Sequence, residues 1–178
     1  MPDTPEQDAR PDGHHTPDTL FARLAELGIP VTTARHDPVF TVHEARALRG
    51  QLPGGHAKNL FLRNKKGVQW LLVCDERRAV DLKAFSERIS SGRLSFGSPE
   101  RLMTALGVAP GSVTPFALIN DTAQAVQPVL DAGLLAEDPL NFHPLDNAMT
   151  TSIARDDLLR FIEACGHTPQ ILDLDATQ

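Results

Sequence analysis

Apolar side chains recur at helical spacing near the start of the chain, which is 178 residues long. Leu20, Leu24 and Leu27 fall on one face of a helix with a period of 3.6 residues, and Gly28 follows them as a stop signal. This pattern predicts a first helix that begins near Thr19.

Short apolar and β-branched runs further along the chain predict strands. Residues 57–64 and 68–74 flank an Asn-Lys-Lys-Gly turn, and this arrangement predicts a hairpin whose second strand is buried. Further strands are predicted at residues 31–36, 93–97, 116–120, 125–130, 141–144 and 170–174.

Capping residues mark the starts of later helices. Ser98, Pro99 and Glu100 suit the cap, the first position and the first turn of a helix. Thr41 and Glu44 have the spacing of a capping box. The later helices are predicted at residues 42–48, 81–89, 98–107 and 154–165. Strands mostly follow strands and helices are interspersed irregularly, so the predicted class is α+β, not a repeated βαβ array.

The composition predicts one domain with a tail. A chain of this length that is 41% hydrophobic can fill one sizeable core. Residues 1–18 contain four prolines, four aspartates and a glutamate and almost nothing apolar, so they are expected to be disordered. The predicted organisation is an acidic, proline-rich tail over residues 1–18 and one domain over residues 19–178.

The compartment follows from what the sequence lacks. It contains no run of about 18 apolar residues, and its acidic N-terminus does not resemble a signal peptide, so we expect a cytoplasmic protein. Cys74 and Cys165 lie far apart without the CxxC spacing of redox or zinc sites, and they are predicted to be buried thiols. No metal or organic cofactor is expected.

The charge is distributed unevenly along the chain. The net charge of -6 argues against a general nucleic-acid or DNA binder, which needs a basic face. Between Lys58 and Arg101, however, ten basic residues outnumber five acidic ones. This segment is either an ordinary solvated surface or a limited patch for one end of an RNA.

Well-known catalytic motifs are missing from the sequence. Residues 50–58 resemble a phosphate-binding loop, but Lys58 does not follow a glycine, no Ser or Thr follows it, and a strand comes next. The sequence also contains no G-x-S-x-G, H-E-x-x-H or G-x-G-x-x-G motif, so a serine hydrolase, a zincin or a Rossmann enzyme has no support.

Three local signatures remain, and together they resemble one family. Residues 55–62, Gly-His-Ala-Lys-Asn-Leu-Phe-Leu, resemble the G-x-x-K-N-L-F-L strand of the YbaK/ProX prolyl-tRNA trans-editing proteins. Residues 111–116, Gly-Ser-Val-Thr-Pro-Phe, resemble the G-x-x-x-P loop of the same family. Residues 141–147, Asn-Phe-His-Pro-Leu-Asp-Asn, resemble the N-F-H-P-x-x-N segment of its alanine-specific branch. The resemblance extends from about Leu20 to Leu174.

The resemblance implies a fold, a reaction and a site. The fold would be one editing domain with a mixed, barrel-like β-sheet and flanking helices. The reaction would be hydrolysis of alanine from mischarged tRNA(Pro), with a ribose hydroxyl of the substrate helping to orient the water. The partners would be the acceptor end of that tRNA and prolyl-tRNA synthetase, with neither DNA nor a membrane. The implied catalytic residues are Lys58, Gly111, Pro115 and His143, and the implied substrate-binding residues are Asn59, Ser112, Val113, Thr114, Asn147 and Thr150.

Each signature also has a structural explanation when it is taken alone. Lys58 could lie at a sheet edge or extend its ammonium to solvent, residues 111–115 could form a simple turn, and His143 could be a hydrogen-bonded core histidine. Three rival functions stay open: a deacylase for seryl or cysteinyl esters, a non-catalytic module that binds a synthetase or tRNA, and a Schiff-base enzyme built on Lys58.

Overall fold

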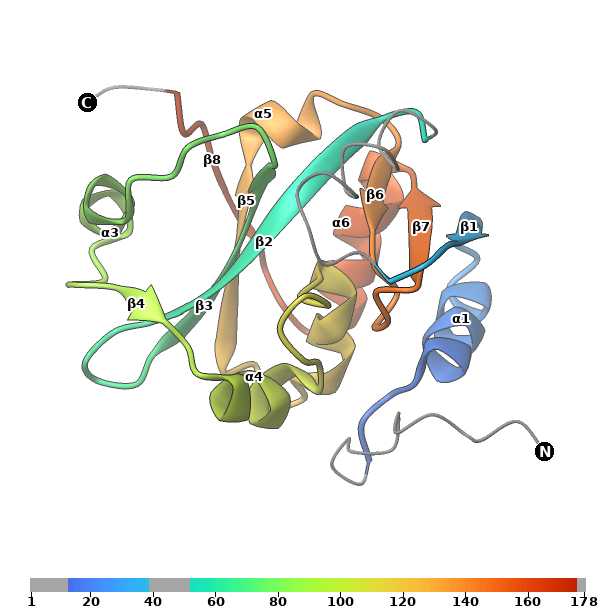
Figure 1. The fold of residues 1–178 in the computed structure, drawn as a ribbon, viewed down its shortest axis with the longest axis horizontal. Helices are drawn as coiled ribbons and strands as arrows, with labels where there is room; N and C mark the ends of the chain where they lie inside the picture. The colour runs from blue at the N-terminus through green and yellow to red at the C-terminus, as the bar shows by residue number, and fades with distance from the viewer. Residues whose placement is uncertain (1–12, 39–51, 176–178) are drawn as a thin grey trace.

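The computed structural model describes residues 13–38 and 52–175. It shows a mixed sheet flanked by helices (Figure 1). Its strands are β1 (Val31–Arg35), β2 (Gly55–Arg63), β3 (Gln69–Asp75), β4 (Ser95–Phe96), β5 (Val126–Asp131), β6 (Leu140–Phe142), β7 (Met149–Ile153) and β8 (Gln170–Leu172). Its helices are α1 (Pro17–Glu26), α3 (Leu82–Ile89), α4 (Pro99–Leu106), the 3-10 helix η1 (Pro115–Asn120), α5 (Ala132–Leu135) and α6 (Arg155–Ala164).

The strands form one eight-stranded sheet in the order β1-β7-β6-β2-β3-β5-β8, with β4 paired to β2. β2 and β3 form the predicted antiparallel hairpin, in which Lys58 lies opposite Cys74. β3, β5 and β8 run parallel to one another, and β6 joins β2 in parallel. The predicted α+β class, with a mixed sheet and flanking helices, is confirmed.

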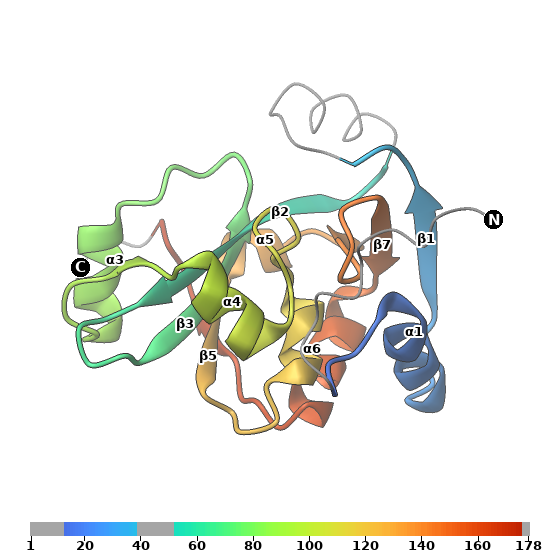
Figure 2. The same ribbon diagram turned by 60° about the horizontal axis from the view of Figure 1, so that its bottom comes forward.

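Two apolar clusters pack on the two faces of β3. Leu71 and Val73 contribute to the larger cluster, which includes residues of α1, α4, η1 and α6. Trp70, Leu72 and Cys74 contribute to the smaller one, which is covered by α3. Figure 2 shows α3 on one side of β3, with α4 and α6 on the other. The alternation of side chains along β3 therefore produces two cores.

The predicted cap of α4 is present, and α3 is capped by Asp81, which was expected to lie inside the helix. The carboxylate of Asp81 accepts from the backbone N–H groups of Lys83 and Ala84, and the Ser98 hydroxyl accepts from the N–H of Arg101. Gly107 ends α4 with a φ of 68°. Such caps satisfy backbone groups that have no partner within the helix.

One predicted strand is wrong. Residues 116–120 were expected to be extended, but they belong to η1. Pro115 occupies the first helical position and the Thr114 hydroxyl accepts from the N–H of Phe116, so the local chemistry starts a helical turn. The run from Pro115 to Leu118 is also buried throughout, which hides the period that distinguishes a strand from a helix.

The first helix begins earlier than predicted, and two short elements were not predicted at all. α1 starts at Pro17 because Thr16 caps it, whereas the sequence pattern suggested Thr19. α5 and β7 had no clear periodic signal. The predicted helix at residues 42–48 and its capping box, formed by Thr41 and Glu44, lie outside the described residues.

Residues 13–16, which the composition assigns to the tail, lie against the domain. The N–H of His15 donates to the side-chain oxygen of Asn120 over 2.7 Å. The side-chain nitrogen of Asn120 in turn donates to the carbonyl of Leu106 over 2.9 Å. These bonds attach the residues just before α1 to the C-terminal ends of α4 and η1. Residues 1–12 lie outside the described part of the chain.

Candidate functional site

The loop after α4 carries the second signature. Gly111 has a φ of +91°, a conformation that favours glycine, and the N–H of Ser112 donates to the carbonyl of Ala109 over 3.0 Å. Thr114 is buried and caps η1, while Val113 packs against the larger core cluster. The loop is therefore fixed at Thr114, where η1 begins, whereas Gly111, which lies closer to α4 in the sequence, is exposed.

The third signature lies beside this loop. A Cβ atom placed on Gly111 would lie 3.8 Å from the side-chain nitrogen of Asn147. Asn147 belongs to a turn in which the N–H of Ala148 donates to the Asp146 carboxylate over 2.8 Å. The structure thus brings Gly111 and Asn147 together, although 36 positions separate them in the sequence.

The first and third signatures are joined through Asn141. Its side-chain nitrogen donates to the carbonyls of Pro53 and Gly55 over 3.0 and 3.1 Å, and its side-chain oxygen accepts from the Ser152 hydroxyl over 2.5 Å. A Cβ on Gly54 would lie 2.2 Å from the carbonyl oxygen of Pro139, so the two backbones are in direct contact. Asn141 therefore holds the start of β2 against β6 and β7, a role that sequence reasoning missed.

His143 is held by its own turn. Its Nδ1 lies 2.8 Å from the carbonyl oxygen of Met149, and because a carbonyl can only accept, Nδ1 carries the hydrogen. Burial lowers the pKa of His143 below its usual value, so the ring is neutral at neutral pH. Nε2 then has a lone pair that can accept a hydrogen bond.

A second histidine lies beside His143, and the sequence did not single it out. The ring of His36 is 6.2 Å from that of His143, and its Nε2 lies 2.8 Å from the Thr150 hydroxyl. The pairing of β1 with β7 places Arg35 opposite Met149 and so brings His36 to this position. A single histidine at a strand end gives no signal in the sequence. Only the pairing of β1 with β7, which are far apart in the sequence, brings His36 beside His143.

Asn59 offers an acceptor without a partner. Asn59 lies on the same face of β2 as Ala57 and Phe61, because every second side chain of a strand shares a face. Phe61 belongs to the larger cluster, and Ala57 and Val113 pack against it. The side-chain oxygen of Asn59 is buried and has no hydrogen-bond partner among the described residues. Such an acceptor is costly unless something else satisfies it.

Lys58 projects to the other face of β2. Its Nζ donates to the carbonyl oxygen of Arg78, and Cys74 lies opposite it on β3. Burial raises the pKa of Cys74 to about 11, and the positive charge of Lys58 opposes this effect. No contact between described residues joins Lys58 to the 111–115 loop or to His143, so its part in the site stays a prediction.

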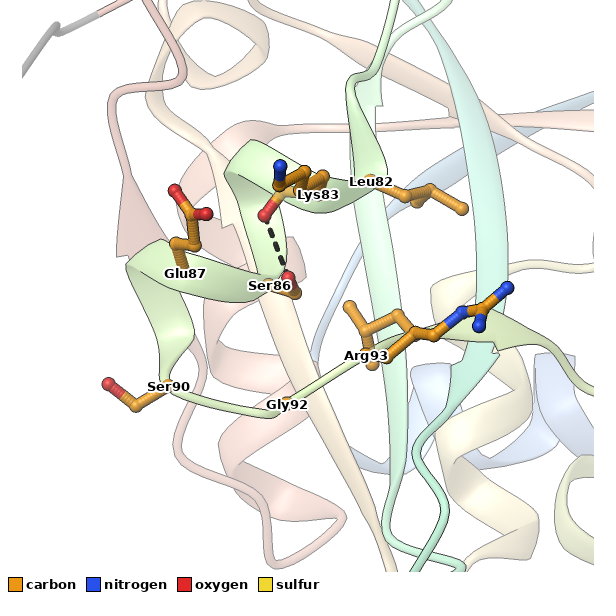
Figure 3. Close-up of a pocket in the computed structure, with 8 residues that line it drawn as sticks. Leu82, Lys83, Ser86, Glu87, Ser90, Gly92 and Arg93 are labelled. Atoms are coloured by element: carbon orange, nitrogen blue, oxygen red, sulfur yellow. Dashed lines mark hydrogen bonds between the residues drawn. The ribbon is translucent and has the colours of Figure 1, made fainter.

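The hollow in Figure 3 lies away from these residues. It has a volume of about 680 Å³ and lies between α3 and the segment at residues 92–94, and none of the predicted site residues lines it. Within residues 13–38 and 52–175, no group of three or more His, Cys, Asp or Glu side chains is arranged to hold a metal ion. In the same ranges, none of the helices combines the length and the apolar character that crossing a membrane requires.

Comparisons with known proteins point to one family. The family model described as the aminoacyl-tRNA editing domain matches residues 36–161. The prolyl-tRNA editing protein ProX of Acetoanaerobium sticklandii is 36% identical over 156 residues, which cover 87% of this chain and 95% of that protein. Prolyl-tRNA synthetase associated domain-containing protein 1 of Danio rerio is 38% identical over 154 residues, which cover 85% of this chain and 84% of that protein.

A solved structure gives the same fold. The structure of a candidate trans-editing enzyme for prolyl tRNA synthetase superposes with a TM-score of 0.66 at 18% identity, covering 92% of this chain and 99% of that one. The match of the family model and the identity to the ProX protein extend over most of the chain. The chain therefore belongs to the family of aminoacyl-tRNA editing domains.

Proposed function

We propose that the protein is a trans-editing deacylase that hydrolyses alanine from mischarged tRNA(Pro) in the cytoplasm. The observation that carries this proposal is the convergence of the three signatures: Asn141 ties the first to the third, and Asn147 lies beside Gly111 of the second. Membership of the editing-domain family and the name of the ProX relative support the same reaction.

The reaction needs no protein nucleophile. Water attacks the carbonyl carbon of the ester, the bond from that carbon to the ribose oxygen breaks, and the ribose oxygen takes up one proton from the water to become a hydroxyl. Alanine is released as a carboxylate, and the second proton of the water passes to solvent. In the substrate-assisted route, the neighbouring ribose hydroxyl orients the water. The protein then has to place the ester and stabilise its developing oxyanion. The absence of a G-x-S-x-G motif from the sequence agrees with this route.

Each part of the site has a task in this scheme. Gly111, Ser112 and the rest of the loop to Pro115 present backbone groups close to the aminoacyl group, because glycine has no side chain there. The side-chain oxygen of Asn59, which has no partner among the residues that the structure describes, can accept from the ammonium or a hydroxyl of the substrate. Nε2 of His143 offers a neutral acceptor, Asn147 and Thr150 brace the pocket, and Lys58 anchors the terminal nucleotide.

The choice of alanine is a matter of size. A hydrophobic pocket gains only about 1 to 3 kcal/mol per methylene, so attraction alone discriminates weakly between small and large amino acids. A closed pocket that blocks larger side chains is therefore the expected basis of selection. Val113 packs against the larger buried cluster, which would give the pocket a rigid wall on this side.

The first test is hydrolysis of alanyl-tRNA(Pro), measured beside the seryl, cysteinyl and prolyl esters. Rapid loss of alanine alone is expected, and Lys58→Ala is expected to lower kcat/KM about 100-fold, because a charge-assisted contact is lost. Lys66→Ala, which removes an exposed lysine from the hairpin turn, is the matched control. Preference for the seryl or cysteinyl ester would contradict the proposed alanine specificity.

A non-catalytic accessory module is the second candidate. The net charge of -6 favours it, because an acidic surface can dock a basic protein such as a synthetase. Prolyl-tRNA synthetase is the partner to test, by complex formation in a pull-down with purified proteins. Binding together with an unchanged half-life of all four esters would support the module, and rapid turnover would exclude it.

A further inference from the structure

A network of charged side chains lies beside Lys58, in the loop that follows β3. Nε of Arg78 donates to the Asp131 carboxylate over 3.0 Å. Its two terminal nitrogens donate to the two carboxylate oxygens of Asp175 over 2.7 and 3.0 Å. The side chain of Asp131 is 0% exposed, so its charge has to be matched inside the protein. One guanidinium therefore satisfies two carboxylates.

The strand order explains why these groups meet. β3, β5 and β8 are parallel neighbours, so Asp75, Asp131 and the residues after Leu172 lie at one edge of the sheet. β2 runs antiparallel to β3, so the first half of β2, with Lys58, reaches the same edge. Figure 1 shows the ends of β5 and β8 together in the upper part of the view, beside α5.

The backbone of Arg78 connects this network to the lysine. Its carbonyl accepts from Lys58, while its N–H donates to the carbonyl of Asp75 over 3.0 Å. A carbonyl directs an ammonium without cancelling its charge, whereas a carboxylate would neutralise it. The ammonium has three hydrogens, so two remain available for a ligand.

The guanidinium also keeps two carboxylates occupied. Asp131 additionally accepts from the N–H groups of Asp75 and Gly133 over 3.3 and 3.0 Å. The bidentate bond to Arg78 lowers the pKa of Asp175, which therefore stays ionised and paired. Both carboxylates in this network are thus engaged by Arg78, and Lys58 keeps a neutral partner.

We propose that Arg78 is a positioning residue for Lys58. The Arg78 side chain is held between Asp131 and Asp175, and this fixes the Arg78 carbonyl that directs the lysine ammonium. This inference rests on the proposed function, in which Lys58 anchors the substrate. A lysine side chain is long and flexible, so an anchor of this kind depends on a fixed acceptor. Arg78 supplies that acceptor through its backbone and holds it through its side chain.

The test is a double-mutant cycle with the full chain acting on alanyl-tRNA(Pro). Arg78→Lys keeps a positive charge near Asp131 but cannot reproduce the planar fork to two carboxylates. It is expected to lower kcat/KM about tenfold, mainly by raising KM. A change of this size lies within the range of interaction energies between residues in contact. In the Lys58→Ala background, the same substitution is expected to change kcat/KM by less than twofold, because its effect passes through the lysine.

Arg77→Lys is the matched control. Arg77 is the neighbouring arginine, its side chain is 73% exposed, and its paired carboxylate is that of Asp75. Its substitution is expected to leave KM within about twofold of the wild type, as for most surface substitutions. Thermal unfolding of every variant shows whether a lower rate reflects a smaller folded fraction, which would reduce kcat and leave KM unchanged.

Asp175→Asn keeps the test decisive if Arg78→Lys fails to fold. Asp175 is 73% exposed, and its substitution leaves the buried pair of Arg78 with Asp131 intact. A rise in KM that disappears in the Lys58→Ala background supports the inference. An unchanged KM in Asp175→Asn and in Arg78→Lys where that variant folds, or effects that add to that of Lys58→Ala, overturns it while the proposed function stands. Inactivity of the wild type on every ester overturns both.

Discussion

Gly111 shows how much one residue can decide in this site. Its φ of +91° belongs to the region that side chains disfavour, and among the described residues beyond its chain neighbours only the Asn147 side chain comes within 4 Å of a Cβ placed there. The position therefore has room for a methyl group but a backbone that resists one. Activity and stability can be separated here, because another glycine in a similar conformation lies far from the site.

Gly111→Ala is expected to destabilise the fold by about 1 kcal/mol and to lower kcat/KM, because the backbone groups of the loop would shift. Gly67→Ala is the control: Gly67 has a φ of +83° in the hairpin turn, and no atom of the described residues beyond its chain neighbours lies within 4 Å of a Cβ placed there. Urea unfolding should show a similar loss in both variants, and the deacylation assay should show a defect in only one. Equal activity in the two variants would contradict a role for the loop backbone.

The pKa of His143 gives a pH dependence with a definite sign. Burial lowers this pKa from its ordinary value of 6.5, so the folded protein binds a proton less readily than the unfolded chain. Above pH 6.5 His143 is neutral in both the folded and the unfolded protein, so its ionisation does not change the free energy of unfolding. The free energy of unfolding is expected to fall as the pH drops from 6.5 through the folded pKa. Comparing urea midpoints of the wild type and His143→Gln at pH 7.5 and 5.5 tests this, since the variant should lose less stability.

At the scale of elements, short side-chain clamps hold the strands that carry the site. β6 is only three residues long, yet Asn141 on it bonds the backbone before β2 and the Ser152 side chain on β7. Short strands have few backbone bonds of their own, so a buried amide that bonds three partners contributes much of their attachment.

Asn141→Ala is expected to cost about 2 kcal/mol or more, because it removes the side-chain donor that bonds the carbonyls of Pro53 and Gly55. Ser152→Ala removes only one bond of the same cluster and should cost about 1 kcal/mol. Denaturant unfolding of both variants measures the difference. If Asn141→Ala were no more destabilising than Ser152→Ala, the clamp would not be what attaches β2 to β6.

The elements that could be predicted from the sequence are those with local signals. The β2–β3 hairpin, the cap of α4 and the period of α6 each depend on residues that lie close together in the sequence. η1 was taken for a strand because its burial hides its period, and β7 lacked a signal because its pairing with β1 and β6 stabilises it. The same holds for the candidate site: the signatures predict Asn59 and His143 as site residues, whereas His36 and Asn141 depend on distant partners.

At the scale of the whole molecule, the charge is divided along the chain. The segment from Lys58 to Arg101 is basic although the protein is acidic, so attraction to a phosphate backbone should be local and modest. The smaller and larger core clusters lie on opposite faces of the sheet, and the basic segment includes the strands between them.

This division predicts a limited salt dependence of the reaction. If about two phosphates are contacted, KM should rise about sevenfold between 50 and 200 mM salt, with kcat nearly constant. Alanyl-adenosine, which lacks those phosphates, should show almost no salt dependence in the same assay. A much steeper slope for the tRNA substrate would indicate an extended nucleic-acid surface, contrary to the acidic total charge.

The two unequal cores have a consequence for how the protein opens. Regions that bury little apolar surface exchange their amide hydrogens first, through openings smaller than complete unfolding. The layer formed by α3 rests on the smaller cluster, and that cluster includes Cys74, the strand neighbour of Lys58. Warming should therefore loosen the α3 layer, and with it the proposed anchor, while the larger cluster around α6 stays closed.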